Sequence, residues 1–429
     1  MKGLRVGKHA EVLPTTLTVE PLFGALDAVV RVPGSKSITN RALLCAALAQ
    51  GQSVLSGALL ADDSFAMVGA IRGLGATVQL DEQTSTIRVT GAALDDGGDV
   101  TIDARQSGTT SRFILPAAAL RTGTTVVDGT EQLRARPFGP LIAALRELGA
   151  DLEERGGPGC LPVAVLKPVR GGRAHIAGDL SSQFLSGLLI AGPAMRDGLV
   201  VEPTTPLVSE PYLRITREVM RAFGATVDDL TAQPGAYRAT QFAVEPDASS
   251  ASYFFGVAAV AGGRVTVMGL GSSSSQGDLA FVDVLEAMGA TVERGVDQTT
   301  ITGPSQLRGV DVDMRDISDT AQTLAAVAVF ADSPTRVRGI GFIRGKETDR
   351  IHAVVTELRR AGIQADEHED GFTVIPGTPV PTVFQTYEDH RMAMSLALLG
   401  LRHRGMTLSD PACVGKTYPG FFADLDQLR

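Results

Sequence analysis

The sequence predicts an α/β protein of six β-α-β-α-β-β repeats, divided between two domains of three repeats each. The first observation is that polar, cap-like residues precede six apolar helical stretches at intervals of 74, 71, 68, 68 and 71 residues. These residues are Ser37, Ser111, Ser182, Ser250, Ser318 and Asp389. The second observation is that five repeats continue with an amphipathic helix that ends at Gly75, Gly149, Gly224, Gly289 or Gly362. Self-similarity at a fixed period is the signature of a repeat architecture.

The first helix of each repeat is apolar nearly all round, which is typical of a helix in the interior of a domain. These stretches are 42–49, 114–120, 184–191, 253–260, 323–330 and 392–399. A short strand-like run follows the helix, as at 264–267 and 406–408. The glycine after the second helix is expected to end it, since glycine adopts the left-handed conformation without penalty. Strands and second helices are therefore expected to cover three buried helices in each domain.

The sixth repeat lacks room for its last two strands before the chain ends. Two strand-like runs, 16–19 and 28–32, precede the first repeat and belong to no other. We therefore expect residues 15–32 to complete the sixth repeat. This assigns residues 1–33 and 246–429 to one discontinuous domain and residues 34–245 to the other. The chain would cross between the domains near Pro33 and near Glu245-Pro246.

Composition excludes several classes of protein. The net charge of −9 argues against general nucleic-acid binding. No uninterrupted apolar stretch is long enough to cross a bilayer, and residues 1–11 lack the apolar segment of a secretion signal. Three cysteines are too few for a disulfide framework. A cytoplasmic protein is expected.

Basic residues recur where the inner helices begin. Three buried helices per domain are expected to run in parallel, so that six helix N-termini, which favour anions, face one interdomain cleft. Taken singly, each cation there could be a solvated surface charge, and each Ser or Asp an ordinary cap. Their grouping in an acidic chain instead predicts a site for more than one phosphate or carboxylate. The cations are Lys36, Arg41, Arg112, Arg136, Lys346, Arg350, Arg391 and Lys416.

Residues 33–37 (Pro-Gly-Ser-Lys-Ser) are not a nucleotide P-loop, because Ser35 and Val30 stand where that motif needs glycine. Together with Arg41, 107–112, 181–184, 346–350, 389–394 and Lys416-Thr417, this segment resembles the 5-enolpyruvylshikimate-3-phosphate synthase family. The resemblance extends in order from about residue 28 to the C-terminus. It implies two inside-out α/β domains with the active site in the cleft between them. It also implies transfer of the enolpyruvyl group of phosphoenolpyruvate to the 5-hydroxyl of shikimate 3-phosphate, with release of phosphate, in the shikimate pathway of aromatic amino-acid biosynthesis.

The resemblance also implies roles for individual residues. Asp319 is similar to the general base of the family, and Glu347 and Lys36 are candidates for the proton donor. Arg112 and His390 are supporting residues. Shikimate 3-phosphate is expected to contact Lys36, Ser37, Arg41, Ser181, Ser182, Gln183, Ser209, Tyr212, Asp319 and Lys346. Phosphoenolpyruvate is expected to contact Lys36, Gly108, Arg136, Gln183, Arg350, Arg391 and Lys416.

This chemistry requires no metal and no organic cofactor. The expected partners are the two small-molecule substrates, without nucleic acid or membrane, and a monomer suffices for closure of two domains. Two residues depart from the family pattern. Gln106 replaces the usual Asn and is expected to crowd the phosphoenolpyruvate pocket, and Phe342 replaces an Asn or Ser that would contact the phosphorylated substrate. An altered acceptor therefore stays open.

Three other functions share features of this sequence pattern. UDP-N-acetylglucosamine enolpyruvyl transferases share the fold, but they carry a cysteine in the stretch that corresponds to residues 129–136, where this chain has none. RNA 3′-phosphate cyclases use similar repeats but would need a basic surface and a histidine that accepts the nucleotide. A catalytically silent anion-binding relative is disfavoured by the presence of Asp319, Glu347 and the whole set of cations.

Overall fold

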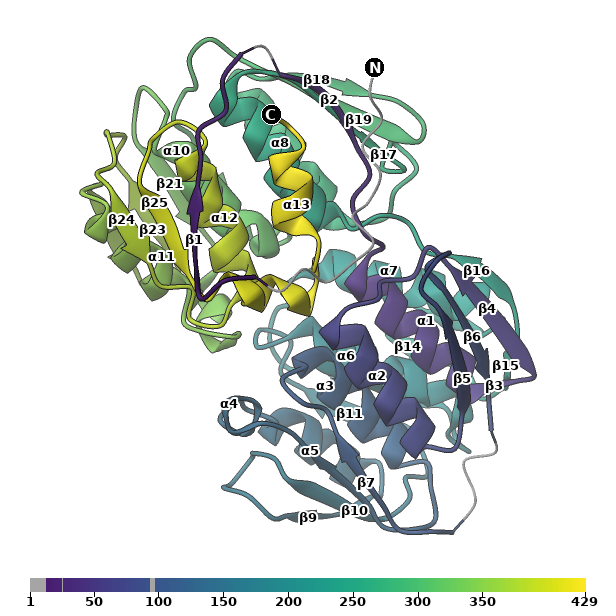
Figure 1. Ribbon diagram of the computed structural model, residues 1–429. Coiled ribbons are helices and arrows are strands. Elements are labelled where there is room, and N and C mark those ends of the chain that lie inside the picture. Colours follow the sequence, from purple (N-terminus) through teal and green to yellow (C-terminus); the bar gives the residue numbers. More distant parts are fainter. Residues whose placement is uncertain (1–12, 25, 93–96) are drawn as a thin grey trace. The chain divides into compact units, whose positions relative to one another are not determined.

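The chain forms two compact units in the computed structural model, which describes residues 13–24, 26–92 and 97–429 (Figure 1). Unit 1 comprises residues 1–33 and 246–429, and unit 2 comprises residues 34–245. Each unit has its own hydrophobic core. Residues 1–11, which were expected to lack a secretion signal, lie outside the described residues.

Unit 2 holds three repeats, and its core is built on three buried helices. These inner helices are α1 (Lys36–Leu48), α3 (Gly108–Ala118) and α6 (Ser182–Ala191). Half-buried second helices follow: α2 (Asp62–Gly73), α5 (Gly139–Glu147) and α7 (Glu210–Ala222), with the short α4 (Glu131–Arg134) and η1 (Gly192–Ala194) between them.

Three four-stranded sheets and one strand pair surround these helices. The strand orders are β16 (Gln241–Ala243)-β4 (Gln52–Ser56)-β6 (Thr86–Thr90)-β5 (Thr77–Asp81), β7 (Val100–Asp103)-β8 (Thr125–Asp128)-β10 (Val163–Lys167)-β9 (Asp151–Glu154), β11 (Gly172–Ile176)-β12 (Leu199–Pro203)-β14 (Thr231–Ala232)-β13 (Val227–Asp228), and β15 (Tyr237–Arg238)-β3 (Ala49–Gln50).

Unit 1 repeats this plan. Its inner helices are α8 (Ala248–Ala261), α10 (Ala321–Ala328) and α12 (His390–Gly400), and its second helices are α9 (Phe281–Ala287), α11 (Arg350–Arg360) and α13 (Phe421–Asp426). Unit 1 also contains the 3₁₀ turns η2 (Gly277–Ala280), η3 (Ser318–Thr320), η4 (Gly341–Gly345) and η5 (Pro411–Lys416). The sheets are β18 (Thr291–Arg294)-β19 (Gln298–Gly303)-β17 (Gly263–Met268)-β2 (Asp27–Val30), β20 (Asp311–Asp313)-β21 (Thr335–Arg338)-β23 (Gly371–Val374)-β22 (Ala365–His368), and β1 (Thr16–Val19)-β25 (Met406–Ser409)-β24 (Thr382–Phe384).

The predicted α/β class and its six repeats are confirmed. In each repeat the strand after the inner helix pairs in parallel with a leading strand, as β8 does with β7 and β25 with β24. The inner helices are buried as expected, and every residue of α3 and α12 lies in the interior. The five predicted stop glycines all adopt a positive φ, from 78° to 105°.

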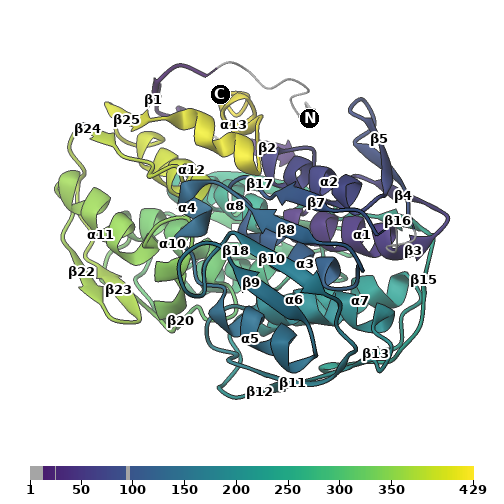
Figure 2. The ribbon, with the colours of Figure 1, turned by 90° about the horizontal axis from the view of Figure 1, so that it is seen from below.

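The prediction for the N-terminal strands is half right. Strand β1 pairs antiparallel with β25 and so adds a strand to the sheet of the sixth repeat, as Figure 2 shows. Strand β2 instead pairs in parallel with β17 of the fourth repeat. Its Ala28 and Val30 are buried in the core of unit 1. Strand β16 directly precedes α8 in the sequence, but it pairs in parallel with β4 of unit 2. Strand β2 takes its place as the leading strand of the fourth repeat.

The predicted helix caps are mostly wrong, by one to four residues. The residues that adopt the cap position are Ser35, Ser107, Ser181 and Asp247, so Ser37, Ser111, Ser182 and Ser250 lie inside their helices. Ser318 begins η3 rather than an α-helix, and Asp389 is the one predicted cap that is confirmed. In the four misplaced cases, a second small polar residue lies further upstream and already has the extended backbone that a cap needs.

The inner helices of unit 1 meet side by side near their N-terminal ends. The Ser252 and Thr323 hydroxyls, from α8 and α10, lie 3.1 Å apart, and Thr323 and Ser395 of α12 lie 3.4 Å apart. In unit 2, Arg41 of α1 donates to Ser186 of α6 at the corresponding depth. The first turns of the three inner helices therefore lie at the same end within each unit.

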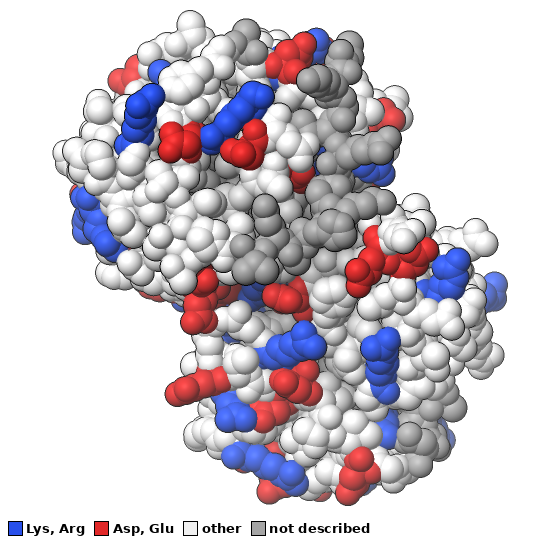
Figure 3. All heavy atoms as spheres, in the orientation of Figure 1, with Lys and Arg blue, Asp and Glu red and all other residues white. Residues whose placement is uncertain are grey.

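The surface carries charges of both signs. On the face shown in Figure 3, Lys and Arg side chains lie among Asp and Glu side chains. Within the described ranges, no helix is both long and apolar enough to cross a bilayer.

Candidate active site

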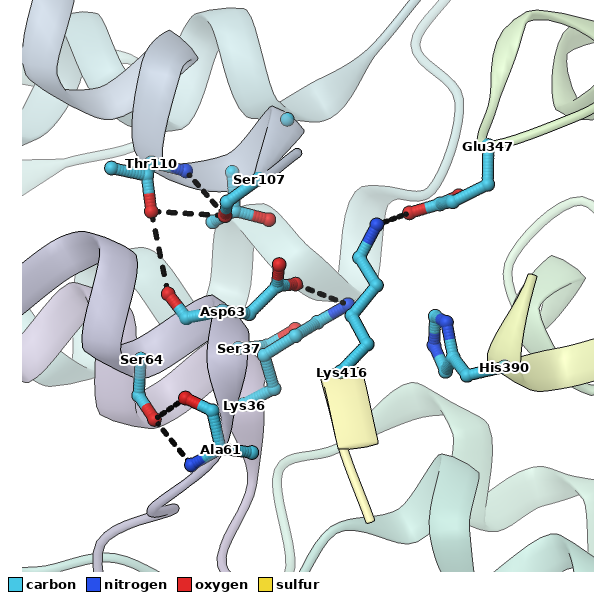
Figure 4. Close-up of polar contacts among 12 residues, drawn as sticks. Lys36, Ser37, Ala61, Asp63, Ser64, Ser107, Thr110, Glu347, His390 and Lys416 are labelled. Carbon is cyan, nitrogen blue, oxygen red and sulfur yellow. Dashed lines mark hydrogen bonds and ion pairs between the residues drawn. The ribbon is translucent and has the colours of Figure 1, made fainter. Parts of the chain in front are cut away.

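Lys36 opens α1 at the N-terminal end of unit 2. Its Nζ lies 3.5 Å from Oδ2 of Asp63, a buried residue in the first turn of α2 (Figure 4). The backbone oxygen of Asp63 accepts from Oγ1 of Thr110, and Thr110 also donates to Ser107, the cap of α3. These contacts connect the starts of α1, α2 and α3.

The starts of α3 and α6 are joined by side chains. Nη1 of Arg112 donates to Oε1 of Gln183 at 2.7 Å, and Nε2 of Gln183 donates to Oγ1 of Thr109 at 3.0 Å. The Arg112 guanidinium also lies 5.6 Å from the ring centroid of Phe138 and 5.2 Å from that of Phe184. Hydrogen bonds and cation–π contacts thus hold a buried cation and an amide at the same place.

Gly108 and Arg136 are in direct contact. A Cβ atom at position 108 would lie 2.5 Å from Nη1 of Arg136 and 3.3 Å from Nη1 of Arg112. Both arginines are buried. A glycine at this position therefore leaves room for two guanidinium groups beside the first turn of α3.

Arg41 is a deeply buried cation of unit 2. Its Nε donates to Thr216 at 2.8 Å, its Nη1 to the Ser37 carbonyl at 2.8 Å, and its Nη2 to Ser186 and the Tyr212 carbonyl. Burial lowers the pKa of Arg41 to about 10. The guanidinium remains charged at neutral pH, and its partners are neutral oxygens.

The three predicted phosphate-binding serines lie at two helix starts. Ser181 caps α6 and accepts from the Gln183 amide, and Ser182 is the first residue of that helix. Ser209 precedes α7 with a left-handed backbone (φ 54°), and its carbonyl accepts from the amide of Tyr212. Strained backbone of this kind at a non-glycine residue is common at ligand sites. We call the predicted residues of this unit, together with Asp63, the unit 2 cluster.

Arg350 is the centre of the charged residues in unit 1. It donates to Asp389 Oδ2 at 2.8 Å, to Asp319 Oδ1 at 3.0 Å and to Glu347 Oε2 at 2.8 Å. Burial disfavours the charged guanidinium, but the carboxylates of Asp389, Glu347 and Asp319 outweigh burial and raise the pKa of Arg350 above its usual value. Arg350 is therefore a permanent cation that holds three acids.

Asp319 lies between two arginines. In addition to Arg350, Nη2 of Arg391 donates to Asp319 Oδ2 at 2.7 Å, and Nη1 of Arg391 donates to the Asp319 carbonyl at 3.2 Å. The side chain of Asp319 keeps 16% of its surface exposed, whereas Arg350 keeps 2%. The carboxylate is thus fixed in direction and still reachable.

Glu347 bridges Arg350 and Lys416, whose Nζ lies 2.9 Å from Oε1 of Glu347 (Figure 4). The adjacent Lys346 has its Nζ 5.9 Å from the ring centroid of Phe342. The aromatic ring that replaces the usual Asn or Ser is therefore a neighbour of a predicted substrate-binding lysine.

His390 is the first residue of α12 and is fully buried, with Nδ1 3.6 Å from Oδ1 of Asp389. This places it beside the carboxylate that Arg350 contacts. We call the predicted residues of this unit, together with Asp389, the unit 1 cluster. Gln106, the other departure from the family pattern, donates through its amide to Gln132 of α4.

Sequence reasoning missed two acids as site residues. Asp63 pairs with Lys36, and Asp389 pairs with Arg350 through two hydrogen bonds. Asp389 is predicted as a helix cap and lies in the 389–394 segment that resembles the family, but none of the predicted catalytic or binding roles falls on it. A buried cation needs a nearby acid or a polar partner, so the excess of predicted cations was itself the signal that acids had been left out.

Within residues 13–24, 26–92 and 97–429, no group of three or more His, Cys, Asp or Glu side chains is arranged to hold a metal ion. The chemistry available is proton transfer by Asp319 and Glu347 and anion binding by arginine and lysine.

Comparison with known proteins shows the family to which the chain belongs. Residues 23–425 match the family model of EPSP synthase (3-phosphoshikimate 1-carboxyvinyltransferase). The chain is 42% identical over 427 residues to a 3-phosphoshikimate 1-carboxyvinyltransferase of Nostoc punctiforme, covering 96% of this chain and 99% of that protein. The chain belongs to the EPSP synthase family.

A second relative with the same name, from Methanoculleus marisnigri, is 42% identical over 411 residues and covers 94% of this chain and 97% of its own length. As a member of the EPSP synthase family, the chain is an enolpyruvyl transferase of the shikimate pathway, which transfers the enolpyruvyl group from phosphoenolpyruvate to shikimate 3-phosphate. Both substrates are small molecules.

Solved structures agree on the fold. An EPSP synthase of Acinetobacter baumannii superposes with a TM-score of 0.80 at 24% identity, covering 96% of this chain and 98% of that one. The enolpyruvyl transferase NikO of Streptomyces tendae superposes with a TM-score of 0.77 at 19% identity, covering 96% and 97%. At these identities the likeness concerns the two-domain fold alone.

Proposed function

We propose that residues of the unit 1 cluster and of the unit 2 cluster take part in one reaction, in which the 5-hydroxyl of shikimate 3-phosphate attacks C2 of phosphoenolpyruvate. In this proposal Asp319 takes the proton of the hydroxyl, because a sugar-like hydroxyl is a poor nucleophile until a base at hydrogen-bond distance removes its proton. The observation that carries the proposal is the position of Asp319, which is directed by two arginines and partly exposed.

Proton donation to C3 makes C2 of phosphoenolpyruvate electrophilic. Glu347 is the proposed donor, with Lys36 as the alternative. Glu347 contacts both Arg350 and Lys416, so two cations stabilise the carboxylate that forms when Glu347 gives up its proton. The tetrahedral intermediate then holds a phosphate and a carboxylate on one carbon. Departure of phosphate from C2, with return of a C3 proton to the carboxylate of Glu347, restores the double bond and yields the enol ether product.

The binding roles follow the chemistry of each cluster. Phosphoenolpyruvate carries a phosphate and a carboxylate, and we assign it Lys36, Gly108, Arg136, Gln183, Arg350, Arg391 and Lys416. Shikimate 3-phosphate is assigned Ser37, Arg41, Ser181, Ser182, Ser209, Tyr212 and Lys346 together with Lys36, Gln183 and Asp319. Arg112 and His390 support these residues, since Arg112 fixes the Gln183 amide and His390 adjoins Asp389.

Release of inorganic phosphate tests the function. The full chain is incubated with phosphoenolpyruvate and either shikimate 3-phosphate or UDP-N-acetylglucosamine. Phosphate release that depends on shikimate 3-phosphate supports the proposal. Release only with UDP-N-acetylglucosamine would contradict it and would indicate a UDP-N-acetylglucosamine enolpyruvyl transferase. No release with either acceptor would contradict a catalytic role. An RNA mobility-shift assay, expected to be negative, covers the remaining alternative.

We further propose that the enzyme works as a monomer in the cytoplasm without metal or organic cofactor. Each catalytic residue named above comes from this one chain. Size-exclusion chromatography with light scattering tests the oligomeric state. Activity that survives extensive treatment with a chelator is expected, and activity restored only by an added metal would contradict the proposal.

A further inference from the structure

Asp278 is a buried acid that no predicted role accounts for. It lies in η2, between the fourth-repeat strand β17 and helix α9, and only 4% of its surface is exposed. Oγ of Ser249, in the first turn of α8, donates to its Oδ2. Burial of a carboxyl group costs free energy unless a hydrogen bond or an ion pair compensates for the lost water.

The position of η2 connects Asp278 to the unit 1 cluster. The turn packs against η3, which carries Asp319, and against the N-terminal part of α8. The preceding Gln276 fixes the turn, because its Nε2 donates to the Pro246 carbonyl at 2.7 Å and its Oε1 accepts from the Ala248 amide at 3.1 Å. Hydrogen bonds of Gln276 therefore fix the turn that carries Asp278, and this turn packs against the turn that carries Asp319.

The charges around Asp278 come from several elements. Asp319 of η3 and Asp247, the cap of α8, oppose its ionisation, and Arg391 of α12 favours it. The acids of α9, Asp283 and Glu286, pair with Arg294 at the exposed surface instead.

Burial raises the pKa of Asp278 to about 7, with the Asp319 charge adding to the effect. The group therefore changes its charge near neutral pH, next to a carboxylate that is expected to act as a base. A negative charge at this place attracts Arg391 and raises the proton affinity of Asp319, since like charges disfavour each other.

We propose that Asp278 is a positioning residue of the transfer reaction, whose negative charge draws on Arg391 and so keeps Asp319 basic enough to deprotonate the acceptor hydroxyl. This rests on the role of Asp319 in the proposed function. Without the charge of Asp278, two arginines hold Asp319 and make it a weaker base. Asp278 itself touches no substrate and acts through its neighbours.

The pH dependence of kcat/KM tests this inference. For the wild-type enzyme we expect kcat/KM to rise with pH as Asp278 ionises, with an apparent pKa near 7. Asp278→Asn cannot ionise, so we expect this rise to be lost and kcat to fall roughly tenfold at pH 8, while kcat at pH 6 changes little. The substrate phosphates titrate identically in both enzymes, so the ratio of the two profiles reports the protein alone.

Two further variants make the outcome decisive. Ser249→Ala removes a hydrogen bond to the ionised carboxyl and is expected to shift the rise in kcat/KM to higher pH. Asp424→Asn is the matched control, because Asp424 is equally buried but accepts from the Tyr418 hydroxyl. It should change the melting temperature and leave the pH profile in place.

A wild-type pH profile in Asp278→Asn would overturn the inference. If that variant does not fold, an unshifted profile in Ser249→Ala does the same. The proposed function is tested separately by Asp319→Ala. If Asp319→Ala is inactive and Asp278→Asn keeps the wild-type pH profile, the role of Asp319 as the base stands and the positioning role of Asp278 is rejected.

Discussion

The two clusters hold their arginines in different ways. In the unit 2 cluster, Arg41 donates to hydroxyls and carbonyls, and Arg112 donates to an amide and lies against two aromatic rings. In the unit 1 cluster, Arg350 contacts three carboxylates, and Lys416 contacts one.

In the proposed mechanism, this difference separates anion binding by the unit 2 arginines from proton transfer by the unit 1 acids. Neutral partners orient a cation without neutralising it, so the unit 2 arginines keep their full attraction for an incoming anion. Carboxylate partners in unit 1 neutralise the cations, and they are also the groups that can move protons. An anionic substrate would there have to displace an acid from an arginine, which couples its binding to the release of that acid.

Removal of the proposed base from unit 1 is expected to have the largest effect on turnover. We expect Asp319→Ala to lower kcat by about 10³–10⁴-fold, because general base catalysis contributes on this scale. Binding of both substrates should persist, as measured by calorimetry, since Arg350 and Arg391 lose a competing partner. Turnover equal to that of the wild type would remove Asp319 from the mechanism.

The corresponding test of unit 2 is Lys36→Met, which keeps the length of the side chain and removes its charge. The expected result is a fall in kcat/KM for phosphoenolpyruvate by about 10²–10³-fold, as for the loss of one preorganised electrostatic donor. Steady-state kinetics with phosphoenolpyruvate varied provides the measurement. Normal kinetics would show that the start of α1 does not contact the reacting groups.

Stability against pH sharpens the comparison within unit 1. The folded pKa of Asp278, about 7, lies above the usual value of 3.8, so burial of its charge costs stability that is absent below pH 4 and grows until pH 7. Asp278→Asn avoids this cost. We expect it to unfold at the same denaturant concentration as wild type at pH 4 and to be roughly 4 kcal/mol more stable at pH 8. Equal stabilities at both pH values would contradict the burial effect.

A smaller change tests the packing in unit 2. In Gly108→Ala the added methyl would meet Nη1 of Arg136 at 2.5 Å, and the arginine must move aside. We expect KM for phosphoenolpyruvate to rise about tenfold, the equivalent of about 1.4 kcal/mol, with kcat nearly unchanged. Gly69→Ala serves as the control, because a Cβ at that helical position meets no atom within 4 Å.

The smallest expected effect compares one hydroxyl in each unit. Thr216 accepts from the charged Arg41, whereas Thr323 contacts the hydroxyls of Ser252 and Ser395. Because hydrogen bonds to charged groups are the stronger ones, Thr216→Val should cost about 2 kcal/mol of unfolding free energy and Thr323→Val about 1. Urea unfolding of both variants measures this. A larger cost for Thr323→Val would contradict the difference between the clusters.

The repeat pattern and the composition of the helix starts were determined by the sequence alone. Periodic buried helices and positive-φ glycines are local properties, so Gly75 or the apolar face of α3 can be recognised without neighbours. The basic residues at the helix starts are equally visible, because the repeats place them at equivalent positions.

The tertiary structure decided which strands and which acids belong together. Strand β2 joins β17, more than 230 residues further along the chain, because that sheet has a free edge and the buried Ala28 and Val30 complete its core. Asp63, Asp278 and Asp389 read as ordinary helix or turn residues in the sequence. They become site residues only when folding buries each of them against a cation or a second acid, and such pairings are long-range contacts that no local pattern records.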